Sequence, residues 1–448
     1  MNLQLFTKWY AKYLIFGICC LILLIIPLIR GPWFGTDVFF FSRLAENPSF
    51  YDSLSFGGRD AIYEYGTSLV LSIYPSVMIE ILPFILGILS FLVFRQILKN
   101  LYEEERIVNI SLLLLVLSPT FIYLFSFTNK YFISMFLVLC SFYFLTTKQY
   151  KWFSIIILAV MPIFNIFIGI LSIILMIIYL ITIKKEKNIF FWSFILLFLI
   201  YILGIIYLIW NYEINLEFLM NNKRNLELLK DIFYDLGNNF GLGIFLSILA
   251  MIGVVTNWEK KYSNLFLFWA TSILIIFSLF IPEAIVLLNI IVILFAARGL
   301  IVLMDLKWSD RQYKKYIVFL ILSGLVFSSV SQINNLTEIQ PTQEVLEGIY
   351  FLKAVSPGTV FTDSSRGIWM NYAGKENIID ENYLFAPDVE ERYNDINKVY
   401  LSRNFDEIKG ILDKYSVDYI WIDQEMKENI AIYYTIQKHL TGFMIKME

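Results

Sequence analysis

The sequence predicts a multi-pass α-helical membrane protein that ends in a small α/β domain outside the membrane. The 448 residues are 58% hydrophobic and only 16% charged, with a mean hydropathy of +0.67; a soluble protein is about 25% charged. The apolar residues gather in uninterrupted runs long enough to cross a bilayer. After Ile333 the composition changes, and 19 acidic residues stand against 11 basic ones.

The apolar runs predict about eleven transmembrane helices. The run from Trp152 to Ile183 is too long for a single span, so we divide it near Pro162. The predicted spans cover residues 13–29, 79–98, 107–125, 131–147, 152–163, 166–183, 189–210, 239–257, 264–281, 284–304 and 316–332.

Lys and Arg orient these spans. With the N-terminus in the cytoplasm, the cytoplasmic loops carry 17 Lys and Arg residues and the outer loops only 7, as the positive-inside rule requires. The predicted location is the plasma membrane, with an extracellular C-terminus. We therefore expect a transmembrane domain at 1–332, with a long first outer loop at 30–78, and an extracytoplasmic α/β domain at 333–448. A second long outer loop follows the seventh span, and long loops are often functional.

The C-terminal segment alternates helix and strand patterns, which predicts a small, mostly parallel sheet. Residues 342–355 have the periodicity of an amphipathic helix. Residues 404–415 have it too, and begin with an Asn-x-x-Glu capping pattern. The expected strands are GTVFTD (358–363), ENIID (376–380), KVYLS (398–402) and DYIWID (418–423).

Several classes of chemistry are excluded by residue type. The only histidine is His439, and the three cysteines lie in apolar runs, so an HExxH zinc site, which needs two histidines, cannot form. The spans carry almost no internal charge, unlike those of a pump or ion-coupled transporter. We expect no nucleic-acid partner.

The ionisable residues gather instead in the first outer loop. Asp37 follows a Gly-Thr turn and opens an aromatic helix, so it could act as a general base on an acceptor hydroxyl or serve only as a helix N-cap. Arg43 could bind an anionic lipid phosphate or merely extend to a headgroup.

Further candidates lie beyond this helix. Asp60 and Glu64 are spaced i, i+4 and would share a face of a helix, next to Arg59; the alternative is a solvated loop. The apolar stretch 65–78 predicts an interfacial helix. The remaining basic candidates for substrate binding are Lys130, in the outer loop between the third and fourth spans, and Lys223 and Arg224 in the second long loop.

The first span, Asp37, the aromatic helix and the interfacial helix together resemble the GT-C glycosyltransferases, which use polyprenyl-phosphate-linked sugars. DVFFFSRLAE (37–46) is similar to the DPYYHYRLAE-type segment of oligosaccharyltransferase catalytic subunits. Residues 118–136 look like the region of their second acidic motif. Residues 360–382 look like a degenerate WWDYG region, with matches at Gly367, Trp369 and Tyr372.

Two departures qualify this resemblance. Thr128-Asn129-Lys130 stands where the acidic motif would supply metal-binding carboxylates, and Asp363-Ser364-Ser365 stands where Trp-Trp-Asp would read an acceptor sequon. Both favour a relative that transfers one sugar from a polyprenyl monophosphate donor without a metal. No cofactor is therefore expected, with a divalent ion (Mg or Mn) as the alternative.

The resemblance implies an inverting transfer at the outer face of the membrane. Asp37 would deprotonate the acceptor, and Arg43, Lys130 or a cation of the second long loop would stabilise the leaving phosphate. The expected partners are a polyprenyl (dolichyl) phosphate-linked sugar, the lipid bilayer, and a glycan, lipid-linked glycan or glycoprotein acceptor. The alternatives are an oligosaccharyltransferase-like enzyme with a diphosphate donor, or a non-catalytic lipid-linked-sugar flippase or scaffold. The Lys-, Asn- and Ile-rich composition suggests an AT-rich prokaryotic genome, of which an archaeal one is an example, and the expected setting is the cell envelope.

Overall fold

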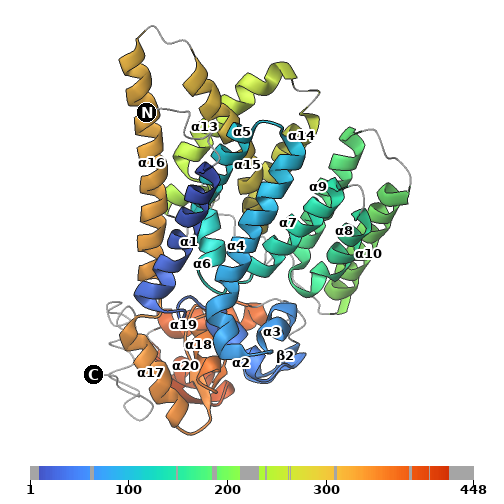
Figure 1. Cartoon of the computed structure of the whole chain (residues 1–448). Helices are drawn as coiled ribbons and strands as arrows, with labels where there is room; N and C mark the ends of the chain where they lie inside the picture. Colours follow the sequence, from blue (N-terminus) through green and yellow to red (C-terminus); the bar gives the residue numbers. More distant parts are fainter. Residues whose placement is uncertain are drawn as a thin grey trace. The chain divides into compact units, whose positions relative to one another are not determined.

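The computed structural model describes residues 10–60, 65–147, 150–183, 189–211, 232–237, 240–260, 262, 264–306, 310–382, 386–402 and 404–422. These residues are mostly helical (Figure 1) and divide into two compact units. The helical unit contains the described residues of Met1–Pro32, Ile79–Asn211 and Asn215–Glu338. The α/β unit contains those of Trp33–Met78 and Ile339–Glu448.

The helical unit is a bundle of apolar helices. Its main elements are α1 (Ala11–Arg30), α4 (Pro75–Leu101), α5 (Glu105–Val116), α6 (Pro119–Ser126), α7 (Phe132–Thr146), α8 (Lys151–Val160), α9 (Ile166–Ile183), α10 (Ile189–Asn211), α13 (Ile244–Asn257), α14 (Leu265–Ser278), α15 (Glu283–Asp305) and α16 (Arg311–Glu338). The short 3-10 turns of this unit are η3 (Met161–Ile163), η4 (Tyr234–Leu236) and η5 (Trp258–Lys260).

Five of these helices are long and apolar enough to cross a membrane, namely α1, α4, α10, α15 and α16. The α5–α6 pair, bent by 63°, makes a sixth if it is one broken span. Each of the eleven predicted segments coincides with a helix or with this pair. The other five helices, α7, α8, α9, α13 and α14, are shorter, whereas a full span takes about 20 residues. The count of eleven spans therefore remains a prediction.

The predicted break near Pro162 is present. Helix α8 ends at Val160, and α9 begins at Ile166 after η3. Pro162 has no backbone N–H to offer the carbonyl of Leu158, four residues earlier. The hydroxyl of Tyr201, from α10, donates a hydrogen bond to that carbonyl oxygen instead. The break is thus stabilised by a neighbouring helix.

Helix α15 is the core of this unit, with 78% of its apolar window buried. It lies against α13 with almost no space between the backbones. A Cβ atom on Gly253 would lie 2.0 Å from the carbonyl oxygen of Phe295, and one on Gly299 would lie 2.0 Å from that of Leu249. Small residues allow such close approach of helices where no hydrophobic force drives them together.

The α/β unit combines the first loop with the C-terminal segment. A three-stranded parallel sheet has the order β4-β3-β5, with Val360 opposite both Asn377 and Tyr419. A short antiparallel hairpin, β1-β2, lies in the first loop. The elements are α2 (Asp37–Glu46), β1 (Tyr51–Asp52), η2 (Ser55–Gly57), β2 (Arg59–Asp60), α3 (Tyr65–Leu71), α17 (Gln343–Ala354), β3 (Thr359–Phe361), α18 (Gly367–Tyr372), β4 (Glu376–Asn377), α19 (Val389–Leu401), α20 (Phe405–Lys414) and β5 (Val417–Ile420).

Both predicted C-terminal helices and three of the four predicted strands are present. Asn404 caps α20, with its side-chain oxygen 3.1 Å from the backbone nitrogen of Asp406. The fourth strand, KVYLS, was predicted wrongly, because these residues continue α19. Ile396 and Val399, three residues apart on one helix face, are both buried in the core of the sheet. A segment as short as the five residues KVYLS cannot distinguish that helical spacing from the alternation of a strand.

The first loop contributes directly to the core of the C-terminal segment. Phe56, from η2, is 1% exposed and lies in the same hydrophobic cluster as Phe361, Ile379 and Ile420. The compact units therefore divide the chain differently from the boundary expected at 332/333, because the first loop shares a unit with residues 339–422. The predicted interfacial stretch 65–78 consists of α3, a turn and the beginning of α4.

Candidate functional site

Asp37 is the first residue of α2, and the turn before it is attached to the C-terminal segment. Gly35, with φ of +75°, donates its backbone N–H to the carbonyl oxygen of Gln340 at 2.8 Å. The hydroxyl of Thr36 donates to the carboxylate of Glu381 at 3.0 Å. Asp37 itself is half-buried. Two hydrogen bonds to residues more than 300 positions later in the sequence therefore fix the turn before Asp37.

Helix α2 packs on α18 through an aromatic cluster, which we define as Trp33, Phe39 and Tyr372. The ring of Tyr372 lies 5.0 Å from that of Phe39 and 5.7 Å from that of Trp33, centroid to centroid. Lys353 also lies over the ring of Tyr372, with its ammonium 4.2 Å from the ring centroid. Burial, with smaller contributions from Tyr350 and Glu46, raises the pKa of Tyr372 to about 12, so its hydroxyl stays protonated.

Arg43 faces a carboxylate of its own loop. Its guanidinium forms a bidentate ion pair with Asp52, with Nη1 2.6 Å from Oδ1. The Asp52 side chain is fully buried, which by itself would raise its pKa; the bonds and charges of Arg43, the charge of Arg59 and the N–H of Leu54 outweigh burial and lower it. The predicted contact of Arg43 with a lipid phosphate stays a prediction.

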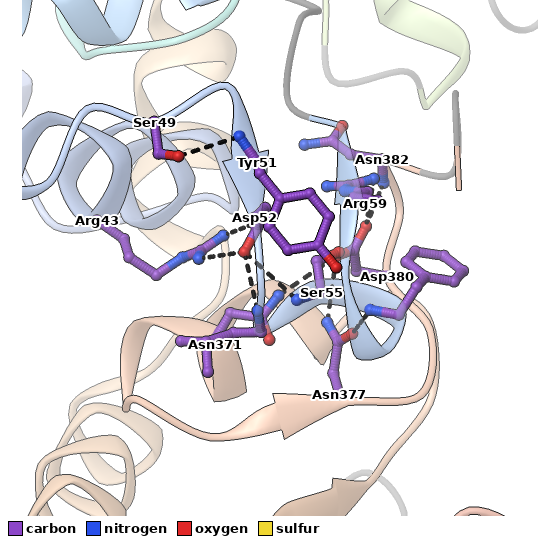
Figure 2. Close-up of polar contacts among 12 residues, drawn as sticks. Arg43, Ser49, Tyr51, Asp52, Ser55, Arg59, Asn371, Asn377, Asp380 and Asn382 are labelled. Carbon is purple, nitrogen blue, oxygen red and sulfur yellow. Dashed lines mark hydrogen bonds and ion pairs between the residues drawn. The ribbon is translucent and has the colours of Figure 1, made fainter. Parts of the chain in front are cut away.

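Arg59 belongs to a buried polar network around Asp380 (Figure 2). Asp380 is wholly buried and accepts hydrogen bonds from Ser55 Oγ at 2.6 Å, Asn377 Nδ2 at 3.1 Å and the backbone N–H of Asn382 at 2.8 Å. Arg59 Nη1 lies 3.6 Å from Oδ1 of Asp380. Sequence reasoning missed Asp380, although it follows strand β4, where polar residues at the carboxyl end of a parallel sheet often gather.

Asp60 does not lie in the helix that was expected to place it on one face with Glu64. Asp60 lies in strand β2, where it pairs with Tyr51, because the Gly57-Gly58 turn folds this segment into a hairpin. Glu64 lies outside the described residues.

Lys130 lies in the helical unit, at the turn between α6 and α7. It is half-buried, and its ammonium is 5.2 Å from the ring centroid of Tyr131. Asn129, fully buried, donates to three backbone carbonyls that end α6, those of Tyr123, Leu124 and Phe127. This amide fixes the turn that presents Lys130. Lys223 and Arg224 lie outside the described residues.

The residues in place do not fit the metal site that the second acidic motif supplies in the oligosaccharyltransferases. Thr128 donates its hydroxyl to the carbonyl oxygen of Ile79 at 2.9 Å, and the Asn129 amide is used within its own turn. Within the described ranges no group of three or more His, Cys, Asp or Glu side chains could hold an ion. We therefore derive no step through a metal.

The segment in place of Trp-Trp-Asp has a local role. Asp363 pairs with the guanidinium of Arg366 and accepts hydrogen bonds from the hydroxyl of Ser365 at 2.7 Å and the backbone N–H of Arg366 at 3.1 Å. These contacts stabilise the turn that leads into α18. Asp363 is thus engaged with its own chain rather than presented as a peptide-reading group.

An apolar helical bundle, a first loop with an aromatic helix that begins at Asp37, and an α/β segment packed on that loop are features of the GT-C type of membrane fold. The resemblance indicated by the sequence is confirmed at the level of the fold. The chain is similar to solved structures of the oligosaccharyltransferase AglB from the archaeon Archaeoglobus fulgidus, at 12% identity in each case.

Three of these structures give consistent overlaps. The apo form matches with a TM-score of 0.65 over 95% of this chain and 71% of that one. The form tethered to an acceptor peptide with an NVT sequon gives 0.62 over 97% and 72%. The complex with an inhibitory peptide and a dolichol-phosphate gives 0.62 over 95% and 71%. No protein-family model and no curated protein matches the sequence.

Proposed function

We propose that this chain is a membrane glycosyltransferase. It transfers a sugar from a polyprenyl-phosphate-linked donor to a glycan, lipid-linked glycan or protein acceptor on the outer face of the membrane. The fold supports the enzyme class, because the solved AglB structures of the same fold include a complex with a dolichol-phosphate. The donor and the residue roles rest on the chain's own side chains.

One observation carries the proposal. The two segments that resemble oligosaccharyltransferase motifs, α2 and α18, are about 330 residues apart in sequence yet pack on each other through the aromatic cluster. Asp37 opens α2 beside this contact, on a turn bound to Gln340 and Glu381. A scaffold that only needed to span the membrane gives no reason for this arrangement.

In the proposed reaction Asp37 accepts the proton of an acceptor hydroxyl. The acceptor oxygen forms a bond to C1 of the sugar while the bond from C1 to the phosphate oxygen breaks, and the configuration at C1 inverts. The polyprenyl phosphate leaves with the bonding electrons. A fixed cation stabilises this developing charge. The candidates for this role are Lys130, a cation of the second long loop, and Arg43, which is paired with Asp52 in the structure.

The choice of acceptor group rests on the residues before α18. Asp363 is paired with Arg366, and no Trp-Trp pair precedes α18, so the sequence offers no reader for an Asn sequon. We therefore favour a hydroxyl acceptor on a glycan over the side-chain amide of Asn.

The test is sugar transfer in liposomes from radiolabelled polyprenyl-phosphate sugars to a cell lipid and glycan extract. Wild type is compared with Asp37→Asn and with Glu376→Gln, which removes one exposed carboxylate elsewhere in the same unit. We expect Asp37→Asn to lose transfer by about 10²–10⁴-fold, Glu376→Gln to keep it, and EDTA to leave the wild type active.

Three outcomes contradict parts of this proposal. Full activity in Asp37→Asn removes the assigned base. Loss of wild-type activity in EDTA means that a metal takes part. Transfer only from diphosphate-linked donors moves the enzyme to the oligosaccharyltransferase-like alternative, and movement of lipid-linked sugar across the bilayer without transfer makes it a flippase.

A further inference from the structure

The helical unit contains a partly open cavity of about 260 Å³ between α4, α7, α9, α14 and α15. Apolar side chains form most of its wall, among them Val138 of α7, Leu175 of α9 and Ile291 of α15. Protein interiors seldom leave a void much larger than a water molecule. A space of this size between membrane helices is therefore a candidate site for a hydrocarbon ligand.

Polar groups gather at one end of this cavity. Arg298, near the C-terminal end of α15, donates Nη1 to Asn257 Oδ1 at 2.8 Å and to Asn264 Oδ1 at 3.0 Å. Its guanidinium also lies over the ring of Tyr102, 5.1 Å from the centroid. Thr182, near the C-terminal end of α9, lines the same end. The cavity thus has an apolar body and a cationic mouth.

Among the described residues, none balances the charge of Arg298. Its hydrogen-bond partners, the Asn257 and Asn264 amides and the Tyr102 side chain, are neutral, and no carboxylate in the described part of the chain pairs with it. Arg106, by contrast, makes a two-bond ion pair with Asp305, at 2.8 and 2.9 Å. A guanidinium beside an apolar cavity is costly without an anion, and phosphate matches its paired donors in geometry and charge.

The length of the cavity fits one lipid chain. Its wall on α15 runs from Leu287 to Arg298, which is about 16 Å at 1.5 Å per residue. One leaflet of a bilayer hydrocarbon core is about 15 Å thick, half of roughly 30 Å. In the predicted orientation, Arg298 lies at the cytoplasmic surface, so the cavity would span the inner leaflet.

We infer that this cavity binds one hydrocarbon chain of an anionic phospholipid, whose phosphate is held by Arg298. The chain replaces contacts that the surrounding helices cannot make with one another, so the lipid stabilises the packing of α4, α9, α14 and α15. This site is separate from the proposed transfer reaction and does not depend on it.

Three variants test the inference in the full-length protein. Arg298→Gln removes the cation and keeps a hydrogen-bonding side chain. Ser172→Phe fills the cavity, and Ser172 suits this change because its buried hydroxyl has no hydrogen-bond partner. Lys99→Gln is the matched control, since it removes a cation at the same helix ends, where Lys99 is paired with Glu105 at the surface.

Each protein is purified in detergent and titrated with chain-matched phosphatidylglycerol and diacylglycerol, which lacks the phosphate, with lipid retention read by native mass spectrometry. We expect wild type and Lys99→Gln to retain one phosphatidylglycerol and to bind it at least about tenfold more tightly than diacylglycerol, since a charge-assisted hydrogen bond to the phosphate contributes about 1.5–3 kcal/mol. Arg298→Gln loses this preference and Ser172→Phe loses the bound lipid. Gel filtration confirms that each variant is folded.

Opposite results overturn the inference. Equal retention of phosphatidylglycerol in wild type, Arg298→Gln and Ser172→Phe means that the lipid binds elsewhere. Retention without a headgroup preference in wild type removes the phosphate contact. Recovery of a polyprenyl phosphate in place of a phospholipid from the purified wild type makes the occupant a different lipid from the one inferred.

Discussion

Ser55 donates its hydroxyl hydrogen to Oδ2 of Asp380 at 2.6 Å, and both side chains are wholly buried although 325 residues separate them. This bond joins the first loop to the segment after strand β4. The backbone N–H of Phe56 reinforces it by donating to Asn377 Oδ1 at 2.9 Å. The first loop is therefore a structural part of the α/β unit.

Asp380→Asn should destabilise the α/β unit by about 3 kcal/mol. The change leaves Arg59, only 5% exposed, without its carboxylate, and a buried charge that loses its partner costs about 3–5 kcal/mol. Thermal unfolding followed by tryptophan fluorescence measures the effect. Glu376→Gln is the control, because an exposed side chain of β4 should change stability by less than about 0.5 kcal/mol. Equal midpoints for the two variants would contradict the assigned role of the network.

The Arg43–Asp52 pair should make stability depend on acid pH. The pKa of Asp52 is lower in the folded protein than in the unfolded chain. The pair therefore stabilises the fold above about pH 4, the unfolded pKa, and this stabilisation disappears as pH falls through the lowered folded pKa. Unfolding midpoints of wild type between pH 3 and pH 7 should drop at the acid end. Asp52→Asn should have a lower unfolding midpoint at pH 7 and a smaller decrease of the midpoint at acid pH. If the midpoints of both proteins decrease equally at acid pH, the Arg43–Asp52 pair is not the cause of the decrease.

Gly253→Ala should destabilise the helical unit by about 1–3 kcal/mol, because its Cβ would overlap the carbonyl of Phe295 and force α13 away from α15. Gly204→Ala, in α10, is the matched control, since no atom lies within 4 Å of the added Cβ. Unfolding in detergent should separate the two variants by several degrees. A Gly253→Ala protein as stable as the control would mean that the helices are not so closely packed.

Tyr372→Ala should reduce sugar transfer about tenfold, while Tyr372→Phe should retain it. The ring of Tyr372 supports α2 through Phe39 and Trp33, and each aromatic pair contributes about 0.5–1.5 kcal/mol. The hydroxyl, with its pKa raised to about 12, cannot take up the acceptor proton near neutral pH. The rate of the liposome transfer reaction decides this. An inactive Tyr372→Phe would instead give the hydroxyl a direct role.

The candidate site was only partly predictable. Asp37 could be found because a carboxylate at the start of a helix next to a span is a local pattern, as is the asparagine cap of α20. The partner of Arg43 could not be found, since Asp52 is one of several acidic residues in the loop and only the hairpin brings it near. Asp380 had only the weak signal of its place after a predicted strand, and Arg298 had no local signal, because each gains its character from residues on other elements.

The sequence by itself determined the helical segments, the break at Pro162 and the parallel strands. These features come from the hydropathy, the missing proline N–H and the side-chain alternation of residues close together in the chain. They can therefore be recognised from the sequence. Three features became visible only in the folded chain: the first loop joins the C-terminal sheet, KVYLS continues a helix, and Arg298 lies at the end of a cavity with no carboxylate paired to it among the described residues. Those features depend on burial and charge contributed by distant parts of the chain, which no local pattern records.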